Sequence, residues 1–364
     1  MWKNCTLGDL ITFQRGHDLP KSSMKNGCYP VVGSNGVIGY HNEYTTEAPS
    51  ITVGRSGNVG KPFIVYGRSW SHNTTLYVKE FKDCDPCFIY YFLKTLDLGN
   101  YAGGSAVPTL NRNHIHSLSV CVPDNMAEQV KIGDCLRMLD EKIAENERIN
   151  NNLLEQALTL FEETFITHDT SNSSLSLYEY ADYINGAAFK PNELGDVGLP
   201  VIKIAELKSG ITDSTRHFAG NKGAKYFVYN KDILFSWSGN PETSIDVFVW
   251  TQGPGILNQH TFNVKSKFEC PWFTYLLLKY HKTVFTHIAS NKQTTGLGHV
   301  TVADLKRLTF PFDMERIKTF ENNISPTMEM YYTNLLENGK LSILRDELLP
   351  RLMSGEMDVS DISL

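Results

Sequence analysis

Two stretches of the chain space their apolar residues alternately four and three positions apart. The first runs from Met126 to Phe165 with no proline and one glycine, and the second covers about Met314 to Met353. This spacing is typical of the seam of a coiled coil. Forty residues form a helix about 60 Å long, which exceeds the width of a domain of this size. We therefore expect two long paired helices, with a helix packed along its own domain as the alternative.

Three residues qualify this prediction. Asn146 and Asn150 take seam positions in the first stretch, where polar side chains weaken a coiled coil but fix its register. Pro326 either kinks the second helix or marks where it begins. The helix–helix contacts that we predict are Ile132, Leu136, Leu139, Ile143, Asn146, Asn150, Leu153, Leu160, Ile324, Met328, Tyr331 and Leu335.

Short β-type runs, separated by glycine, proline and asparagine, fill the rest of the chain. Each of two regions also contains one aromatic helix, near Pro86–Lys94 and near Pro271–Lys279, with proline in its favoured place in the first turn. The mixture predicts an α+β unit in each region. We expect strands at Val31–Val32, Ile51–Val53, Leu118–Val122, Val201–Ile202, Ile233–Phe235 and Leu308–Phe312.

The two regions align with each other as an internal repeat. Leu7–Gly16 matches Leu177–Gly186, Ser56-Gly57-Asn58 matches Ser238-Gly239-Asn240, and the order of matches is kept along the chain. Self-similarity of this kind indicates a duplicated domain. We divide the chain into a first α+β domain at 1–123, a long helix at 124–169, a second α+β domain at 170–312, and a second long helix with a C-terminal tail at 313–364.

Length and cysteine content suggest a cytoplasmic protein of two domains. The 364 residues include seven cysteines, no signal peptide is recognisable at the start, and no apolar run approaches the roughly 18 residues of a membrane span. Cys84 and Cys87 form a lone C-x-x-C pair. A structural zinc site needs a second pair of ligands, so we read two reduced thiols and assign no metal.

The net charge of −6 argues against nucleic-acid binding until it is divided by region. Residues 1–122 contain eleven Lys and Arg against eight Asp and Glu, and residues 175–312 contain fourteen against eleven. The helical regions 123–174 and 313–364 have four against eleven and five against ten. The acidity therefore belongs to the helices, and the repeats are mildly basic.

The loops of the repeats mix cations with amides, hydroxyls and aromatic rings. Arg, Asn and Gln match base edges, and Lys and Ser hold phosphates, although an ordinary solvated turn remains the alternative for any one loop. Arg55 and Arg112 are our first choices for direct contacts. The full set of predicted DNA contacts is Arg15, Lys21, Ser34, Asn35, Arg55, Ser56, Asn58, Lys61, Arg68, His72, Asn73, Asn111, Arg112, Lys190, Lys203, Lys222, Lys225, Trp237, Ser238, Asn240, Gln259, His260, Lys292, Gln293 and Thr294.

An enzymatic alternative rests on the loop Gly54–Lys61. It resembles a phosphate-binding G-x-x-x-x-G-K-[ST] loop, but the spacing is one residue too long and Pro62 replaces the hydroxyl residue. Its counterpart at Trp237-Ser238-Gly239-Asn240 has no matching lysine. Asn240-Pro241-Glu242 also lacks the second proline and the aromatic residue of a methyltransferase N-P-P-[YF] motif. We therefore assign no catalytic residue to the chain.

Four segments resemble the DNA-specificity subunit of type I restriction-modification enzymes. Leu344–Met357 is similar to the C-terminal signature of that family, and Pro123 with Glu128-Gln129 is similar to the start of its first long helix. Leu160–Phe165 resembles the end of that helix, and Leu7–Leu10 resembles the start of a target-recognition domain. The second helix departs from the pattern, since Asp313–Arg316 lacks a clear Glu-Gln pair.

The resemblance implies two target-recognition domains separated by two long antiparallel coiled-coil helices. Each domain would read one half of a split, asymmetric double-stranded DNA site, and helix length would set the unread spacer. Two methyltransferase (modification) subunits would bring S-adenosylmethionine, and two restriction subunits, where present, would bring ATP and Mg²⁺ dependence. The chain itself would hold no cofactor. A related methyltransferase–nuclease system without a separate restriction subunit, and a protein-binding scaffold without a DNA role, remain as alternatives.

Overall fold

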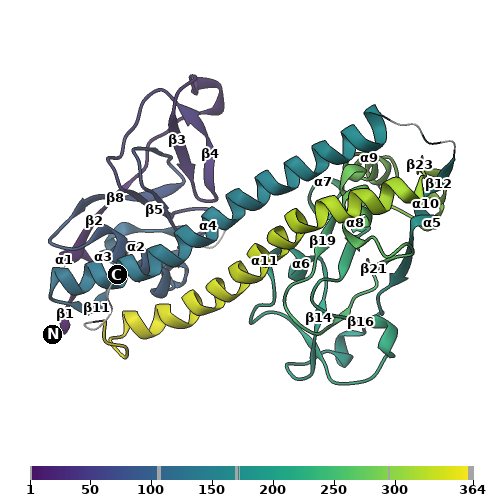
Figure 1. The fold of residues 1–364 in the computed structure, drawn as a ribbon. Coiled ribbons are helices and arrows are strands. Elements are labelled where there is room, and N and C mark those ends of the chain that lie inside the picture. The colour runs from purple at the N-terminus through teal and green to yellow at the C-terminus, as the bar shows by residue number, and fades with distance from the viewer. Residues whose placement is uncertain (1, 105–107, 169–170, 172, 294–295, 360–364) are drawn as a thin grey trace. The chain divides into compact units, whose positions relative to one another are not determined.

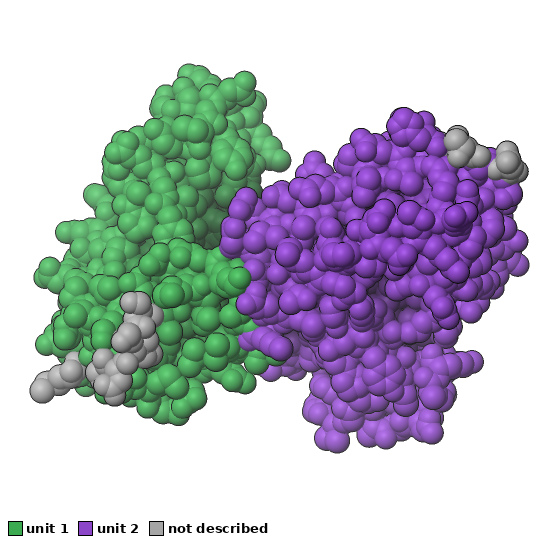
Figure 2. All heavy atoms as spheres, in the orientation of Figure 1, with its two compact units in different colours: residues 1–142, 341–364 green, residues 143–340 purple. Residues whose placement is uncertain are grey.

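The computed structural model describes residues 2–104, 108–168, 171, 173–293 and 296–359 (Figure 1). The chain forms two compact units (Figure 2). The first contains residues 1–142 and 341–364, and the second contains residues 143–340. Each unit thus combines one α+β domain with parts of both long helices, whereas the sequence led us to treat the helices as separate segments.

An antiparallel four-stranded sheet forms the centre of the first unit. Its order is β2 (Ile11–Arg15), β8 (Thr75–Phe81), β5 (Ser50–Gly54) and β6 (Pro62–Val65). All five residues of β5 are buried. The sheet shares one hydrophobic core with helix α2 (Pro86–Thr95), which buries Phe88, Ile89, Tyr91, Phe92 and Leu93. The expected aromatic helix is therefore confirmed as the element that covers this sheet.

Smaller sheets complete the first domain. Strand β1 (Trp2–Thr6) pairs with β11 (Ser119–Pro123), which brings the two ends of the domain together. A second sheet has the order β4 (Gly36–His41), β3 (Tyr29–Gly33) and β7 (Trp70–Ser71). The strands predicted around Val31–Val32 and Leu118–Val122 correspond to β3 and β11.

The second unit repeats this plan. Its main sheet has the order β13 (Ala181–Asn185), β21 (Thr261–Ser266), β17 (Ile233–Ser236) and β19 (Asp246–Val249), and helix α8 (Pro271–Tyr280) shares its core. Strands β12 (Ser174–Ser176) and β23 (Thr309–Pro311) pair at the ends of the domain. The smaller sheet has the order β15 (His217–Phe218), β14 (Leu199–Ile202), β20 (Gly255–Leu257) and β16 (Phe227–Val228).

The second copy contains a helix that the sequence reading missed. Helix α9 (Lys282–Asn291) follows α8, the one aromatic helix that we expected in this copy. Its sequence carries several β-branched residues, which lower helix propensity. Phe285 and Ala289, four residues apart on one helical face, are its buried positions, and this packing stabilises the helix.

Equivalent hydrogen bonds confirm the duplication. The amide of Leu7 donates to the carbonyl of Leu118 at 2.9 Å, and that of Leu177 donates to Leu308 at 2.8 Å. Gly16 and Gly186 each approach a backbone carbonyl so closely that an added Cβ would lie 2.1 Å from its oxygen. Glycine is required at both places because no other residue fits.

The two long helices are α4 (Met126–Glu162), continued by a π-helical segment at Glu163–Thr167, and α11 (Met314–Met353). Pro326 lies inside α11 and does not mark its beginning. The residue is exposed, while Ile324 and Met328 on either side are 3% and 0% exposed. Burial of these neighbours holds the helix together across the missing backbone donor.

The helices pair antiparallel within the second unit. Asn146 donates to Asn338 at 2.8 Å and to Glu337 at 2.6 Å, and Asn150 donates to the carbonyl of Tyr331 at 3.1 Å. Residue numbers therefore rise along α4 in the direction in which they fall along α11, as Figure 1 shows. In the first unit, Arg345 of α11 donates to Asp140 of α4 at 2.7 Å. The antiparallel arrangement that the family resemblance implied is confirmed.

Several predicted seam residues pack into domain cores. Ile132 and Leu136 belong to the core of the first unit, and Ile324 and Met328 to that of the second. Leu160 is 40% exposed, and the buried position there is Phe161, one residue later. Leu139, Ile143, Leu153, Tyr331 and Leu335 are partly buried. Both the paired-helix and the packed-helix predictions therefore hold, at different positions of the same helices.

Candidate nucleic-acid interface

Several predicted contacts of the first domain gather around one hollow. Arg15 ends β2, Arg55 follows β5, and Arg112 begins the short helix α3 (Arg112–His116). Together with Asn111 and His114 they line a hollow of about 470 Å³. Among the described residues that line it there is no Asp or Glu. The hollow therefore collects positive charge from three segments that are far apart in the sequence.

Backbone hydrogen bonds hold Arg55 in place on both sides. Its amide donates to the carbonyl of Thr74 at 2.8 Å, and its carbonyl accepts from the amide of Leu110 at 2.9 Å. Within the described part of the chain, the guanidinium groups of Arg55 and Arg112 have no hydrogen-bond or ion-pair partner. Arg15 lies 3.9 Å from Asp18, which is a loose contact between exposed groups.

The glycine-rich loop Gly54–Lys61 is not a phosphate-binding loop. It joins β5 to β6, which pair antiparallel from Ser50 with Val65 to Val53 with Pro62. Its amides turn inward: Gly54 donates to Lys61 at 3.0 Å and Gly60 donates to Gly54 at 2.8 Å. A phosphate-binding loop leads instead into a helix and leaves its amides free. The nucleotide-binding alternative is therefore wrong.

The other predicted contacts of the first domain have varied surroundings. Arg68 is paired with Glu47 at 2.8 Å and lies over the ring of Tyr44, and Asn73 donates to Asp18. The His72 ring lies 3.1 Å from the hydroxyl of Thr74. Lys61 lines a different hollow, beside Lys94 and Arg345. Asn111 caps α3 by accepting a hydrogen bond from the amide of Asn113. The side chains of Lys21, Asn35 and Asn58 are exposed, whereas those of Ser34 and Ser56 are partly buried.

The second domain repeats the backbone around the hollow at Arg55 with other side chains. We call this arrangement the recognition corner, formed by Arg15, Arg55 and Asn111–His114 in the first domain and by Asn185, Trp237 and Thr301–Asp304 in the second. The amide of Trp237 donates to the carbonyl of His260 at 3.4 Å, and its carbonyl accepts from the amide of Val300 at 2.8 Å. Trp237 therefore occupies the position of Arg55. Its indole nitrogen donates to Asn185 at 3.2 Å, and its ring stacks on Phe262 at 5.6 Å. The side chains of Gln259 and His260 lie 3.3 Å apart beside it.

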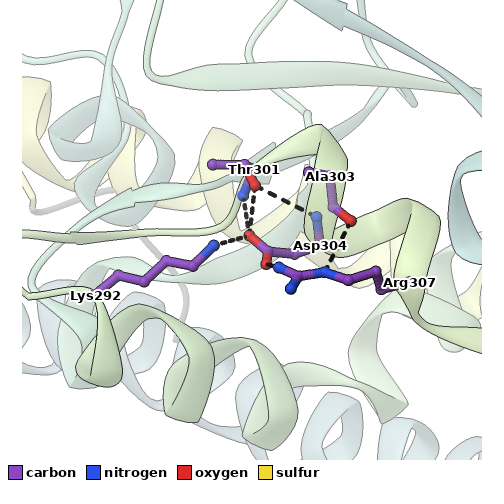
Figure 3. A network of polar contacts seen from close by, with 5 residues as sticks. All are labelled: Lys292, Thr301, Ala303, Asp304 and Arg307. Carbon is purple, nitrogen blue, oxygen red and sulfur yellow. Dashed lines mark hydrogen bonds and ion pairs between the residues drawn. The ribbon is translucent and has the colours of Figure 1, made fainter.

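Lys292 is bound within its own domain (Figure 3). Its ammonium pairs with the carboxylate of Asp304, which also pairs with Arg307 and accepts from Thr301. Burial alone would raise the pKa of Asp304, but the hydrogen bonds from Lys292 and Thr301 hold it below its ordinary value. Lys292, which we predicted as a DNA contact, therefore has an ion-pair partner within the domain.

Comparison with known proteins places both domains in one family. Type I restriction modification DNA specificity domains match residues 1–155 and 174–312. The chain belongs to the DNA-specificity family of type I restriction-modification enzymes. It is 24% identical over 311 residues to the MjaIX specificity subunit of Methanocaldococcus jannaschii, covering 76% of this chain and 70% of the relative.

Further relatives agree with this assignment. The HindI specificity subunit of Haemophilus influenzae is 23% identical over 335 residues, with 69% of this chain and 71% of the relative covered. The crystal structure of a type I S subunit from M. genitalium superimposes with a TM-score of 0.64 at 16% identity, covering 97% and 96% of the two chains. As a specificity subunit, the chain is a DNA-recognition component and not a catalytic one.

The remaining contacts predicted for this specificity subunit lie elsewhere in the second domain. Lys222 pairs with Glu193 at 2.9 Å and lies over Phe189, and Asn240 accepts from the amides of Glu242 and Thr243, capping α7 (Pro241–Ser244). Both are engaged in structural contacts. Lys190 and Gln293 are exposed, and Lys203 is partly buried. Lys225 lies over the ring of Tyr226, and Ser238 pairs with His299 in a short sheet. Thr294 lies outside the described residues.

Two residues of the recognition corner, Asn185 and His114, were not among the predicted DNA contacts. Asn185 aligns with Arg15 in the sequence repeat, so the alignment itself contained that signal. His114 lies in helix α3 with Arg112 but was not chosen. The role of Asp304 in binding Lys292 had no local signal, because the two residues belong to different turns.

Cys84 and Cys87 contact different parts of the backbone. The thiol of Cys84 donates to the carbonyl of Leu10 at 3.1 Å, and that of Cys87 donates to Gly133 at 3.4 Å. Burial raises the pKa of each thiol to about 12. Both thiols are therefore protonated at neutral pH. Among the described residues, no helix is long and apolar enough to cross a membrane.

Proposed function

We propose that this chain reads a bipartite, asymmetric site on double-stranded DNA. Residues 1–123 bind one half of the site, and residues 170–312 bind the other. One observation carries the proposal: the two domains share a backbone frame but place Arg55 and Trp237 at the same position in it. A common frame with different reading side chains suits two half-sites of different sequence.

The charge distribution supports DNA as the ligand. Both domains are mildly basic, and the acidic residues belong to the helices. The guanidinium groups around the first hollow have no carboxylate among its described lining residues. Unpaired cations in one concave place attract a polyanion, and arginine forms paired hydrogen bonds with base edges and phosphates.

The long helices supply a surface for other subunits. Met126, Val130 and Met138 lie at multiples of four positions on α4 and are 43%, 37% and 49% exposed. A stripe of large apolar side chains on one helical face suits a protein partner. We assign this surface to two modification subunits, which would bring S-adenosylmethionine, and two restriction subunits, where present, would bring ATP and Mg²⁺. The assembly acts on genomic DNA in the cytoplasm.

Binding measurements on the assembled complex test this function. The chain, co-purified with its modification partner, should bind one class of duplex tightly, and the logarithm of its affinity should fall linearly with the logarithm of salt concentration. Specific affinity should exceed that for random duplex by a factor of about 10³ or more. Equal affinity for all duplexes would contradict sequence reading, and failure to bind DNA would favour the protein-scaffold alternative.

A further inference from the structure

The two recognition corners are equivalent in backbone but differ in how their cations are paired. Arg55 and Trp237 accept at their carbonyls from Leu110 and Val300. In the next position Asn111 caps α3 and Thr301 caps α10 (Val302–Arg307). Counting onward from these caps, Arg112 is equivalent to Val302 and His114 is equivalent to Asp304.

The first corner gathers three cations, of which only Arg15 has a loose contact with a carboxylate, that of Asp18. Arg15, Arg55 and Arg112 line one hollow, and the described lining residues include no carboxylate. Like charges gathered in one place repel each other. Such an arrangement is favourable once a ligand with several acceptor atoms fills the hollow, and DNA offers both phosphates and base edges.

The second corner pairs its two cations with one buried carboxylate. Asp304 is 2% exposed and binds Lys292 and Arg307 (Figure 3). The position of Arg112 is taken by Val302, and that of Arg15 by Asn185, which accepts from Trp237 at 3.2 Å. Aromatic, amide and imidazole groups of Trp237, Gln259 and His260 therefore replace guanidinium groups as the available reading side chains.

Among the three arginines, Arg55 is the one suited to a base edge. It is partly buried, and two backbone hydrogen bonds fix the residue. Because the backbone is already fixed and the side chain is partly shielded, only side-chain torsions remain to be ordered when Arg55 binds. Arg15 and Arg112 are exposed at the rim, where flexible cations bind phosphates without reading sequence.

Resting on the proposed function, we propose that Arg55 reads a guanine in the half-site bound by residues 1–123. Its guanidinium donates to O6 and N7 of the base in the major groove, the most common specific contact between arginine and DNA. Arg15 and Arg112 neutralise flanking phosphates. The half-site bound by residues 170–312 is read without an arginine at the equivalent corner.

The test compares variants of the full chain, co-expressed with the modification partner, by genome-wide mapping of methylated sites and by binding to matched duplexes. Arg55→Ala should make one guanine position degenerate, with about 5- to 150-fold loss of discrimination there. Arg55→Lys should lose part of this discrimination, because lysine keeps the charge but not the rigid paired donors of arginine. Arg112→Ala should weaken binding to all duplexes alike and reduce the salt slope by about one.

Trp237→Ala is the matched control in the second copy, and it should leave the guanine position in the first half-site unchanged. If Arg55→Ala retains full discrimination at that position, or weakens all sequences alike, Arg55 binds phosphate and the inference is overturned. If Arg55→Ala fails to assemble, Arg55→Gln, whose amide matches adenine and not guanine, decides in its place. A wild-type complex without any specific site would instead overturn the proposed function.

Discussion

Asn334 of α11 donates a side-chain hydrogen bond of 2.9 Å to Asn150 of α4. The amide of Asn150 in turn donates to the carbonyl of Tyr331 at 3.1 Å, and Asn150 is only 4% exposed. A buried amide with both ends bonded fixes the register of two helices, since any shift would leave polar groups without partners. The seam of this specificity subunit is thus specified by asparagines.

Asn150→Ala should lower the free energy of unfolding by about 1–3 kcal/mol, because Asn334 and the Tyr331 carbonyl lose their partner. Asn151→Ala is the matched control, one residue along the same helix and exposed, and should change stability by less than about 0.5 kcal/mol. Urea denaturation monitored by circular dichroism measures both. Equal effects of the two substitutions would show that the seam amide has no special role.

Two helical glycines should respond to alanine in opposite directions. A Cβ on Gly339 of α11 would meet nothing within 4 Å, so Gly339→Ala should stabilise the protein by up to about 1 kcal/mol through helix propensity. A Cβ on Gly133 of α4 would lie 2.7 Å from the backbone nitrogen of Phe88 at the start of α2. Gly133→Ala should therefore destabilise the protein. Thermal melts compare the pair, and stabilisation by both would contradict the close approach of α4 to α2.

The buried carboxylate of Asp304 should make the second unit sensitive to acid. Asp304→Asn should cost about 1–3 kcal/mol, since Lys292 and Arg307 lose their partner. The exposed Asp213, replaced in the control Asp213→Asn, should have little effect. Denaturation at pH 7 compares the two variants, and a neutral result for Asp304→Asn would exclude a stabilising network.

The lowered pKa of Asp304 also predicts how the stability of the protein changes with pH. The folded-state pKa of Asp304 lies below its unfolded value of about 3.9. The stability that its charge contributes is therefore present above that value and is lost as the pH falls through the folded pKa. Stability of the wild type should fall more steeply than that of Asp304→Asn as the pH is lowered below about pH 4. Parallel curves would contradict the lowered pKa.

Cysteine reactivity should separate the C-x-x-C pair from the exposed thiols. Cys28 and Cys121 are exposed, whereas the pKa of Cys84 and that of Cys87 are each raised to about 12 by burial. Iodoacetamide at pH 7.5 should therefore modify Cys28 and Cys121 first, because the thiolate is the reactive form. Mass spectrometry locates the modified residues. Rapid labelling of Cys84 and Cys87, slowed by added zinc, would revive the metal-site alternative.

The sequence predicted the fold well because its signals are local or repeated. Periodicity identified α4 and α11, and the repeat identified both domains. It could not separate seam residues from core residues: Ile132 and Asn146 obey the same spacing, yet Ile132 packs on a domain core and Asn146 meets the other helix. That difference depends on what lies beside each turn, which the helical period does not encode.

The departure from the family pattern at Asp313–Arg316 has a structural counterpart. Gln129 of the first helix is 1% exposed and accepts from the amide of Asp85, just before α2. In the second copy Glu321, 8% exposed, accepts from the amides of Trp272 and Phe273 at the start of α8. Both helices thus satisfy amides at the start of the aromatic helix, but from different positions along the chain.

The candidate contacts were harder to predict than the fold. Residue type alone could not distinguish Arg55, whose guanidinium has no partner among the described residues, from Arg68 and Lys292, which are paired with Glu47 and Asp304. Each of those acids is distant enough in sequence that its proximity appears only in the folded chain. Side-chain availability is a property of tertiary structure.

Exchange of one recognition domain tests the central claim most directly. Residues 1–123 would be replaced by the equivalent domain of a specificity subunit with a known target, and methylated sites would be mapped across the genome of a host that also expresses the modification partner. The account predicts a hybrid target in which one half-site changes to that of the donor and the other half-site stays the same. An unchanged target, or a change in both half-sites, would contradict it.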